Sequence, residues 1–303
     1  MAGPPPPDDR TPPRPDIWMP GSRSVPPPRA WRKGEPIPLV PHTFGSAFSA
    51  TFALVRLYWP MIATIAAVFW IPFEFLEAFA TRGIEQAVRT GTVEVRAEPV
   101  WKSGLVGIVG VIVALLVGPL VTGALIRAVA RAHLGQPISL RTAIEEAWPF
   151  FGSILLVLLL TFVVVVGGLI LLVIPGLVFL VRFSLAQPVL LVEGMRGREA
   201  LRRSWRLVKG RSWWVFGLPY VVGLVAALPT LIATVPLTLA ARNASADSAW
   251  ILRGIASSVG VVVQQVFSAT AIMVVYFDRR VRNDMLDHPR LAAELERSDR
   301  RRR

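Results

Sequence analysis

The sequence predicts an all-α fold: a polytopic membrane bundle of six transmembrane helices with three amphipathic interfacial helices on the cytoplasmic face. Of the 303 residues, 53% are hydrophobic and only 17% are charged, whereas soluble domains carry about a quarter charged residues. Several apolar runs also reach the roughly 20 residues that cross a bilayer as a helix. A third observation is that basic, amphipathic segments precede these runs.

The apolar runs predict spans at residues 57–80, 103–129, 150–174, 176–192, 213–239 and 254–277. The stretch from 150 to 192 is too long for a single crossing. We expect a hairpin there, with its tight turn at Pro175-Gly176, because Pro ends a helix and Gly tolerates a positive φ.

Three lead-in segments, residues 42–56, 136–148 and 193–217, precede the three apolar pairs. Each carries two small residues at helical i, i+4 spacing, namely Ala47 with Thr51, Ala143 with Ala147, and Ala200 with Ser204. This pattern predicts three parallel units of one surface helix plus two spans, an arrangement known in membrane folds. The alternative is that amphipathic basic helices simply resemble one another.

The chain divides into a disordered Pro/Arg-rich tail (1–41), a six-span membrane domain (42–280) and a basic tail (281–303). No apolar segment follows Met1, so we expect no cleaved signal peptide. Arg is concentrated in both tails and in the loops after spans two and four, which predicts that these lie in the cytoplasm. Arg far outnumbers Lys, as in GC-rich genomes, which suggests a bacterial inner membrane.

The net charge of +13 would also suit a nucleic-acid-binding protein. Its Arg residues lie in the tails and beside apolar runs, however, where membrane orientation accounts for them. We therefore expect no nucleic-acid partner. The chain has no cysteine, which excludes disulfides and thiolate metal sites within it.

The third lead-in is the most basic segment of the chain. At helical spacing Leu201, Ser204, Trp205 and Val208 share one face and Arg residues fill the other, as in helices that lie flat in a membrane interface. We expect it to contact anionic lipid headgroups; the other reading is a topology signal alone. The candidate contacts are Arg198, Arg202, Arg203, Arg206, Lys209 and Arg211.

Ionisable residues inside the spans are the leading functional candidates, because an unpaired charge in hydrocarbon is costly. Glu74 and Arg182 each lie six residues from the expected outer end of a span, or about 9 Å below the outer surface. We expect them to form a pair inside the bundle. The alternative is that each reaches separately to the interface.

Three glutamines, Gln187, Gln264 and Gln265, also fall within predicted spans. They suit a polar cavity between the spans, and equally well hydrogen bonds that join neighbouring helices.

No catalytic constellation is visible in the sequence. It has no phosphate-binding loop, no pair of metal-ligating His or Glu on one helix face and no Ser/His/Asp arrangement. His42, His133 and His288 lie far apart in the sequence. We therefore expect no enzyme, no metal and no cofactor.

One family resemblance is carried by specific residues. Ile174-Pro175-Gly176, residues 181–188, Glu193-Gly194 and residues 200–210 resemble the membrane domain of glycerophosphoryl diester phosphodiesterases. The closing motif at residues 276–282 is similar as well, but it lacks the Leu that commonly follows Asp in that family. The resemblance covers about residues 37–290.

The resemblance implies a stand-alone membrane domain. In the full enzymes a separate barrel domain carries out hydrolysis with carboxylates and His, and this chain has no room for one. We expect a non-enzymatic scaffold or accessory protein associated with membrane lipids, with any protein partner unknown. The alternative is a transporter or lipid-moving protein with a site between the spans.

Overall fold

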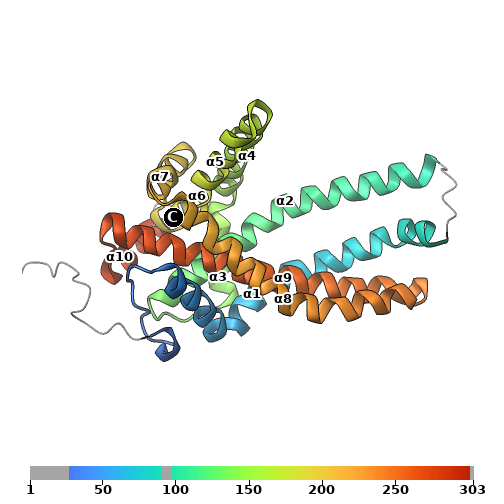
Figure 1. Ribbon diagram of the computed structural model, residues 1–303, viewed down its shortest axis with the longest axis horizontal. Helices are drawn as coiled ribbons and strands as arrows, with labels where there is room; N and C mark the ends of the chain where they lie inside the picture. Colours follow the sequence, from blue (N-terminus) through green and yellow to red (C-terminus); the bar gives the residue numbers. More distant parts are fainter. Residues whose placement is uncertain (1–26, 91–96, 301–303) are drawn as a thin grey trace, which may run out of the picture.

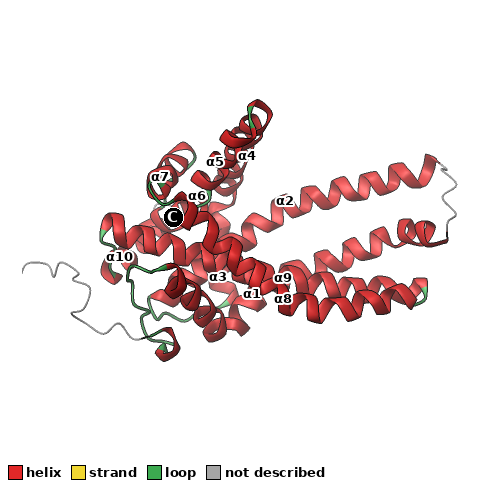
Figure 2. Ribbon diagram, in the orientation of Figure 1, coloured by secondary structure: helices red, strands yellow, loops and turns green. Residues whose placement is uncertain are grey.

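The computed structural model describes residues 27–90 and 97–300, all of which form helices, turns and loops without any strand in these ranges (Figure 2). The helices are η1 (Pro28–Ala30), α1 (Phe44–Thr90), α2 (Ala97–His133), α3 (Leu140–Ala147), η2 (Trp148–Phe150), α4 (Phe151–Leu171), α5 (Val173–Phe183), α6 (Ala186–Pro188), η3 (Val189–Glu193), α7 (Arg198–Val208), α8 (Ser212–Asn243), α9 (Ala246–Asp284) and α10 (His288–Arg300). The chain is thus all-α, as predicted.

Six helical segments of the described chain are long and apolar enough to cross a membrane, which confirms the predicted number. Their bounds are Phe44–Arg82, Ile108–His133, Leu140–Leu171, Val173–Glu193, Ser212–Asn243 and Ser248–Asp284. Their outward surfaces carry many large exposed apolar side chains, which suits a hydrocarbon surrounding. The protein is therefore a multi-pass membrane protein.

Helix α9 is the centre of the bundle. It packs along α1 on one side and α8 on the other, and α2 contacts both α1 and α9. These four long helices run together toward one end of the molecule (Figure 1). At the opposite end, which we call the base, α3, α7 and α10 gather around the last turns of α2 and α9.

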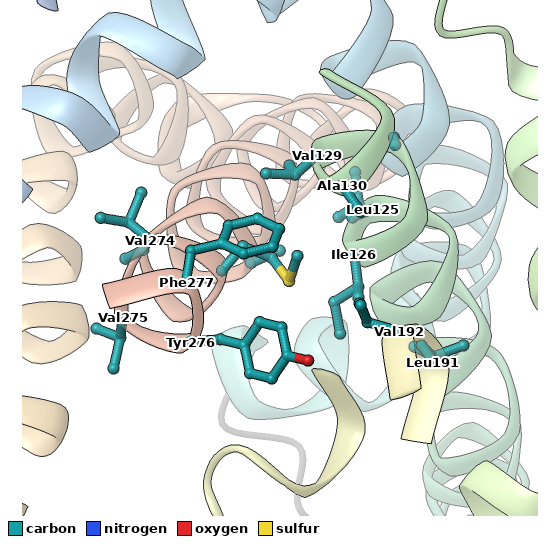
Figure 3. Packing of buried hydrophobic residues seen from close by; sticks show 14 of the residues in the cluster. Leu125, Ile126, Val129, Ala130, Leu191, Val192, Val274, Val275, Tyr276 and Phe277 are labelled. Carbon is teal, nitrogen blue, oxygen red and sulfur yellow. The ribbon is translucent and has the colours of Figure 1, made fainter. Parts of the chain in front are cut away.

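The best-packed apolar core lies at the base. Tyr276 and Phe277 of α9 point toward Ile126 of α2, with Val192 of η3 beside them (Figure 3), and all four side chains are nearly inaccessible to solvent. Burial there is denser than along the spans, where lipid would cover the outer faces.

The lead-in segments differ from one another in a way that the sequence pattern did not predict. α3 and α7 are separate helices, but the first lead-in continues directly into α1. The second ends at Trp148-Pro149 in η2, and the third ends at Gly210, which has a φ of +87°. No such break separates residues 44–56 from the span. The first of the three predicted lead-in helices is therefore continuous with its span.

All six small residues of the proposed repeat are nonetheless buried, from Ala47 and Thr51 to Ala200 and Ser204. In each lead-in the i, i+4 pair lets the helix approach its neighbours closely. This local equivalence agrees with the repeat, and the superposition of the three units stays a prediction.

The hairpin in the middle of the chain turns earlier than expected. Leu172 is extended, with φ −160° and ψ 137°, and it separates α4 from α5. Pro175 lies in the first turn of α5, where its missing N–H would have had no helical partner anyway. The predicted turn at Pro175-Gly176 is therefore wrong. The α4–α5 hairpin leaves the four long helices at an angle (Figure 1).

Part of the predicted N-terminal tail is ordered; residues 1–26 lie outside the described residues. Ile37 is buried, its N–H donates to His133 O at 3.0 Å, and its carbonyl lies 2.8 Å from His288 Nε2. Gly135, with a φ of +68°, allows this segment to pack directly against it, because a Cβ there would lie only 2.8 Å from Gly34 O. The expectation of disorder is thus wrong from residue 27 onward.

The C-terminal region is also built into the fold. α9 extends to Asp284, beyond the expected end of the membrane domain at 280, and α10 buries Leu291 and Leu295 against the base. Residues 301–303 of the predicted basic tail lie outside the described part.

Candidate functional site

A buried carboxylate occupies the middle of the base. Glu193 is the last residue of η3, a π-helical turn that ends at Gly194 in the left-handed conformation. It accepts a hydrogen bond from Arg203 Nε at 2.9 Å and another from the Tyr276 hydroxyl at 3.1 Å. Arg280 Nη1 lies 3.1 Å from the same carboxylate. Glu193, at the end of an apolar span, therefore joins α7 to α9.

Arg280 extends these contacts to the C-terminal helix. It donates to Glu294 at 2.7 Å and to the Tyr276 hydroxyl at 2.8 Å, and its Nε lies 2.7 Å from Asp284. Arg203 pairs with Asp284 as well. We call these six residues the Glu193 cluster: Glu193, Arg203, Tyr276, Arg280, Asp284 and Glu294.

The Glu193 cluster is suited to holding helices in one arrangement. Its three carboxylates face two guanidinium groups and one phenol, so each buried charge has an opposite charge beside it. Such a network adds less to stability than its contacts suggest, because desolvation offsets the attraction, but breaking it leaves a charge buried alone. The cluster joins η3, α7, α9 and α10.

A second buried arginine secures the far end of α10. Arg127 of α2 is 1% exposed; it donates to the Ser298 hydroxyl at 2.9 Å and to Asp299 at 3.1 Å. Its guanidinium carbon lies 4.7 Å from the centre of the Phe150 ring. α10 is therefore held to the base through both α9 and α2.

The ordered N-terminal segment is fixed by a third charged contact. Asp278 is fully buried. Its carboxylate accepts hydrogen bonds from the backbone N–H of His42 at 2.6 Å and from Arg282 Nε at 3.0 Å. Arg282 in turn donates to the His42 carbonyl at 2.7 Å. Burial lowers the pKa of the His42 imidazole, although the nearby Asp278 opposes this shift.

The three histidines lie far apart in the sequence, yet they come together around this segment. The backbone carbonyl of His133 accepts a hydrogen bond from the Ile37 N–H, and the His288 ring lies beside the Ile37 carbonyl. Their separation in sequence thus gave no sign of their proximity. Within residues 27–90 and 97–300, no group of three His, Asp or Glu side chains could hold a metal ion.

Helix α7 has two distinct faces. Ala200, Leu201, Ser204, Leu207 and Val208 are buried, and the Ser204 hydroxyl donates to Arg182 O at 2.7 Å. The opposite face carries exposed cations, which are Arg198, Arg202, Arg206 and the adjacent Lys209 and Arg211. The amphipathic helix that the sequence predicts is present.

One of the six predicted headgroup contacts is placed elsewhere. Arg203 points into the Glu193 cluster, where two carboxylates occupy its guanidinium. Helical periodicity could not distinguish it from Arg202, because its partners lie 10 and 81 residues away in the chain. Arg203 is therefore a structural residue of the base.

The predicted pair of Glu74 and Arg182 is wrong. Arg182 lies near the base end of α5, with its guanidinium 4.9 Å from the centre of the Trp205 ring of α7, while Glu74 lies beside Ser257 of α9. The depth of Arg182 was counted from a turn at Gly176, whereas α5 begins at Val173 and ends at Phe183. Arg182 thus contacts α7 instead of Glu74.

Of the three predicted glutamines, one joins two helices by a hydrogen bond and another lines a groove. Gln265 Nε2 donates to Thr122 Oγ1 at 2.6 Å, which joins α9 to α2. Gln264, the next residue, is exposed and lines a groove between α8 and α9. Gln187 is half-buried in the short helix α6.

Of the six residues of the Glu193 cluster, only Arg203 is predicted from the sequence as a site residue. Glu193, Tyr276 and Arg280 lie in the segments that carry the family resemblance, but no periodicity links them. Asp284 and Glu294 fall in a region read as a charged tail. The one usable signal is a lone carboxylate at the end of an apolar span, since such a group needs a partner.

Comparison with known proteins yields one partial match. The sequence model of a domain of unknown function (DUF7847) matches residues 147–279. The matched region runs from the end of α3 to the base end of α9 and includes Glu193, Arg203 and Tyr276, together with all of α7. No curated protein and no solved structure matches the chain.

Proposed function

We propose that this protein is a non-enzymatic scaffold or accessory protein that gathers anionic lipid headgroups on α7, at the cytoplasmic face of a bacterial inner membrane. The observation that carries the proposal is the exposed ridge of Arg198, Arg202 and Arg206. Within the described part of the chain these three side chains have no ion pair. They are spaced four residues apart and therefore share one line along the helix.

The packing of α7 supports the same role. Its buried face fixes the helix to α4, α5 and the base, so the ridge is presented by a rigid element. Trp205 packs against Phe179 and Phe183 of α5 at centroid distances of 5.9 Å. Aromatic side chains next to a row of arginines are typical of interfacial helices.

Arginine distribution supports the proposed orientation. Most of the described arginines lie at the base, on α7, on α10, in the ordered N-terminal segment and on the last turns of α2 and α9. Positive segments stay in the cytoplasm, so both termini belong on that side. The resemblance to the phosphodiesterase membrane domain belongs to this proposal too; it fits a lipid-associated module without the hydrolytic barrel.

The test compares lipid enrichment in variants of equal charge. R198Q/R202Q/R206Q removes the ridge, and R290Q/R297Q/R300Q removes the same charge from exposed positions of α10. Each protein is reconstituted in nanodiscs of phosphatidylglycerol and phosphatidylcholine, and retained lipids are measured by native mass spectrometry. At about 1 kcal/mol per arginine, the α7 variant should lose most of the phosphatidylglycerol enrichment and the α10 variant should keep it.

Equal enrichment in wild type and the α7 variant would contradict headgroup binding by the ridge. Equal loss in both variants would show that total charge, and not α7, attracts the lipid. Hydrolysis of glycerophosphodiesters by the purified protein would contradict the non-enzymatic part of the proposal.

A further inference from the structure

A groove of about 400 Å³ lies between α8 and α9 and reaches the junction of α5 and α6 at Ser184. This volume is within the range of roughly 300–1,000 Å³ that is usual for small-molecule sites. Along α9 the groove extends from Ile272 to Gln264, which lies about 21 Å from Asp278 at 1.5 Å per residue. It therefore runs from near the base toward the middle of the spans.

Two polar side chains in this groove lack partners. Gln264 and Ser268 are one helical turn apart on α9, and neither forms a hydrogen bond with any residue that the structure describes. The neighbouring Gln265 and Thr270 do form such bonds. A polar group at this depth needs a partner, because hydrocarbon supplies none.

The wall formed by α8 is shaped around the Gln264 amide. A Cβ on Gly223 would lie 2.8 Å from Gln264 Nε2, so the missing side chain gives this amide its space. Pro219, which also lines the groove, has no N–H, and the carbonyl of Val215 therefore lacks its usual helical donor. Tyr220 adds an exposed hydroxyl at the rim.

The ligand must be uncharged. Every described residue that lines the groove is apolar or neutral, without any Asp, Glu, Lys, Arg or His. A charged group placed there would lose its hydration without gaining an opposite charge. The ligand must also enter from the lipid, because the groove opens between membrane-spanning helices.

We propose that the α8–α9 groove binds an uncharged lipid that carries a hydroxyl and carbonyl groups on acyl chains, the class of diacylglycerol. Its hydroxyl would donate to the Gln264 carbonyl oxygen and accept from the Ser268 hydroxyl or the Gln264 amide. The acyl chains would lie along the apolar walls. This site is independent of the arginine ridge on α7, which takes the charged headgroups.

The experiment uses a diacylglycerol with a photoreactive diazirine in one acyl chain. Full-length protein is reconstituted in phosphatidylcholine nanodiscs, irradiated with the probe, and the labelled peptides are mapped. Labelling should fall on α8 and α9 beside the groove. Unlabelled dioleoylglycerol should compete, and an equal amount of phosphatidylglycerol should not.

The variant Q264L/S268A replaces the two unpartnered polar side chains with apolar ones of similar size, a change that membrane helices tolerate. It should reduce labelling about tenfold, as expected for the loss of two hydrogen bonds of ordinary strength. Thr238→Val, a polar-to-apolar change at an exposed position of α8 outside the groove, should leave labelling unchanged.

Unchanged labelling in Q264L/S268A would overturn the proposal, as would equal competition by phosphatidylglycerol, since the groove would then take any acyl chain. Absence of labelling on α8 and α9 would overturn it as well. The R198Q/R202Q/R206Q protein should be labelled like wild type. The two proposals can therefore fail separately.

Discussion

Glu193 pairs with two arginines that lie on two different helices, which the periodicity of one helix cannot predict. Its carboxylate is 6% exposed and lies against Arg203 of α7 and Arg280 of α9. The partners come from two stretches of the chain far from η3, so their proximity depends on how the helices pack. At this scale the base is held together by ion pairs that are shielded from water.

Replacement of Glu193 tests this account. Glu193→Ala should lower the free energy of unfolding by about 1–3 kcal/mol, because Arg203 and the Tyr276 hydroxyl lose a buried acceptor while Arg280 keeps Asp284 and Glu294. Glu193→Gln should cost less, since its amide oxygen still accepts the hydrogen bond from Arg203. Denaturation with sodium dodecyl sulfate, followed by circular dichroism, measures the difference.

Glu296→Ala is the matched control. Its carboxylate is 69% exposed and, among the residues that the structure describes, pairs only with Arg300 on the same helix, so its loss should change stability by no more than about 0.5 kcal/mol. A Glu193→Ala protein as stable as this control would show that the Glu193 cluster contributes nothing to folding.

At the scale of elements, the α4–α5 hairpin depends on two glycines that face each other. A Cβ on Gly168 would lie 2.9 Å from the Phe179 ring and 3.0 Å from Gly176 Cα. The two helices therefore approach backbone to backbone, as small residues allow in membranes. Gly176 is thus important for close packing, and not for the turn that its sequence position suggested.

Gly168→Ala should destabilise the protein by about 1–3 kcal/mol, because the added methyl group meets backbone that cannot move without separating the helices. Gly167→Ala is the natural control, since a Cβ there meets nothing within 4 Å. The control should be neutral or slightly stabilising, given the better helix propensity of Ala. Equal stability of the two variants by the same denaturation assay would disprove the close contact.

At the scale of the whole molecule, six spans require both ends on the same side of the membrane. The absence of native cysteine makes this directly measurable. Ser245→Cys places a thiol between α8 and α9, and Arg297→Cys places one on the exposed side of α10. A membrane-impermeant maleimide should label Ser245→Cys in intact cells and Arg297→Cys only after lysis.

Labelling of Arg297→Cys in intact cells with protection of Ser245→Cys would invert the proposed orientation. Labelling of both positions from the same side would show that α9 does not cross the membrane. Wild-type protein, which has no thiol, supplies the background.

The sequence by itself determined the class, the number of spans and the presence of a basic amphipathic helix at residues 198–208. These features depend on local composition: apolar length determines whether a helix can cross a membrane, and 3.6-residue periodicity determines which side chains share a face. Spacing alone therefore predicted the basic face of this helix, although it also assigned Arg203 to that face.

Only the tertiary structure decided which charges pair and which polar groups remain free. Arg203 differs from Arg202 through partners on η3 and α9, and Gln264 differs from Gln265 because Thr122 lies beside only one of them. Arg182 meets Trp205 because α5 begins at Val173 and ends at Phe183, which places Arg182 in its last turn. Each outcome depends on contacts between residues far apart in the chain, and neither composition nor periodicity carries that information.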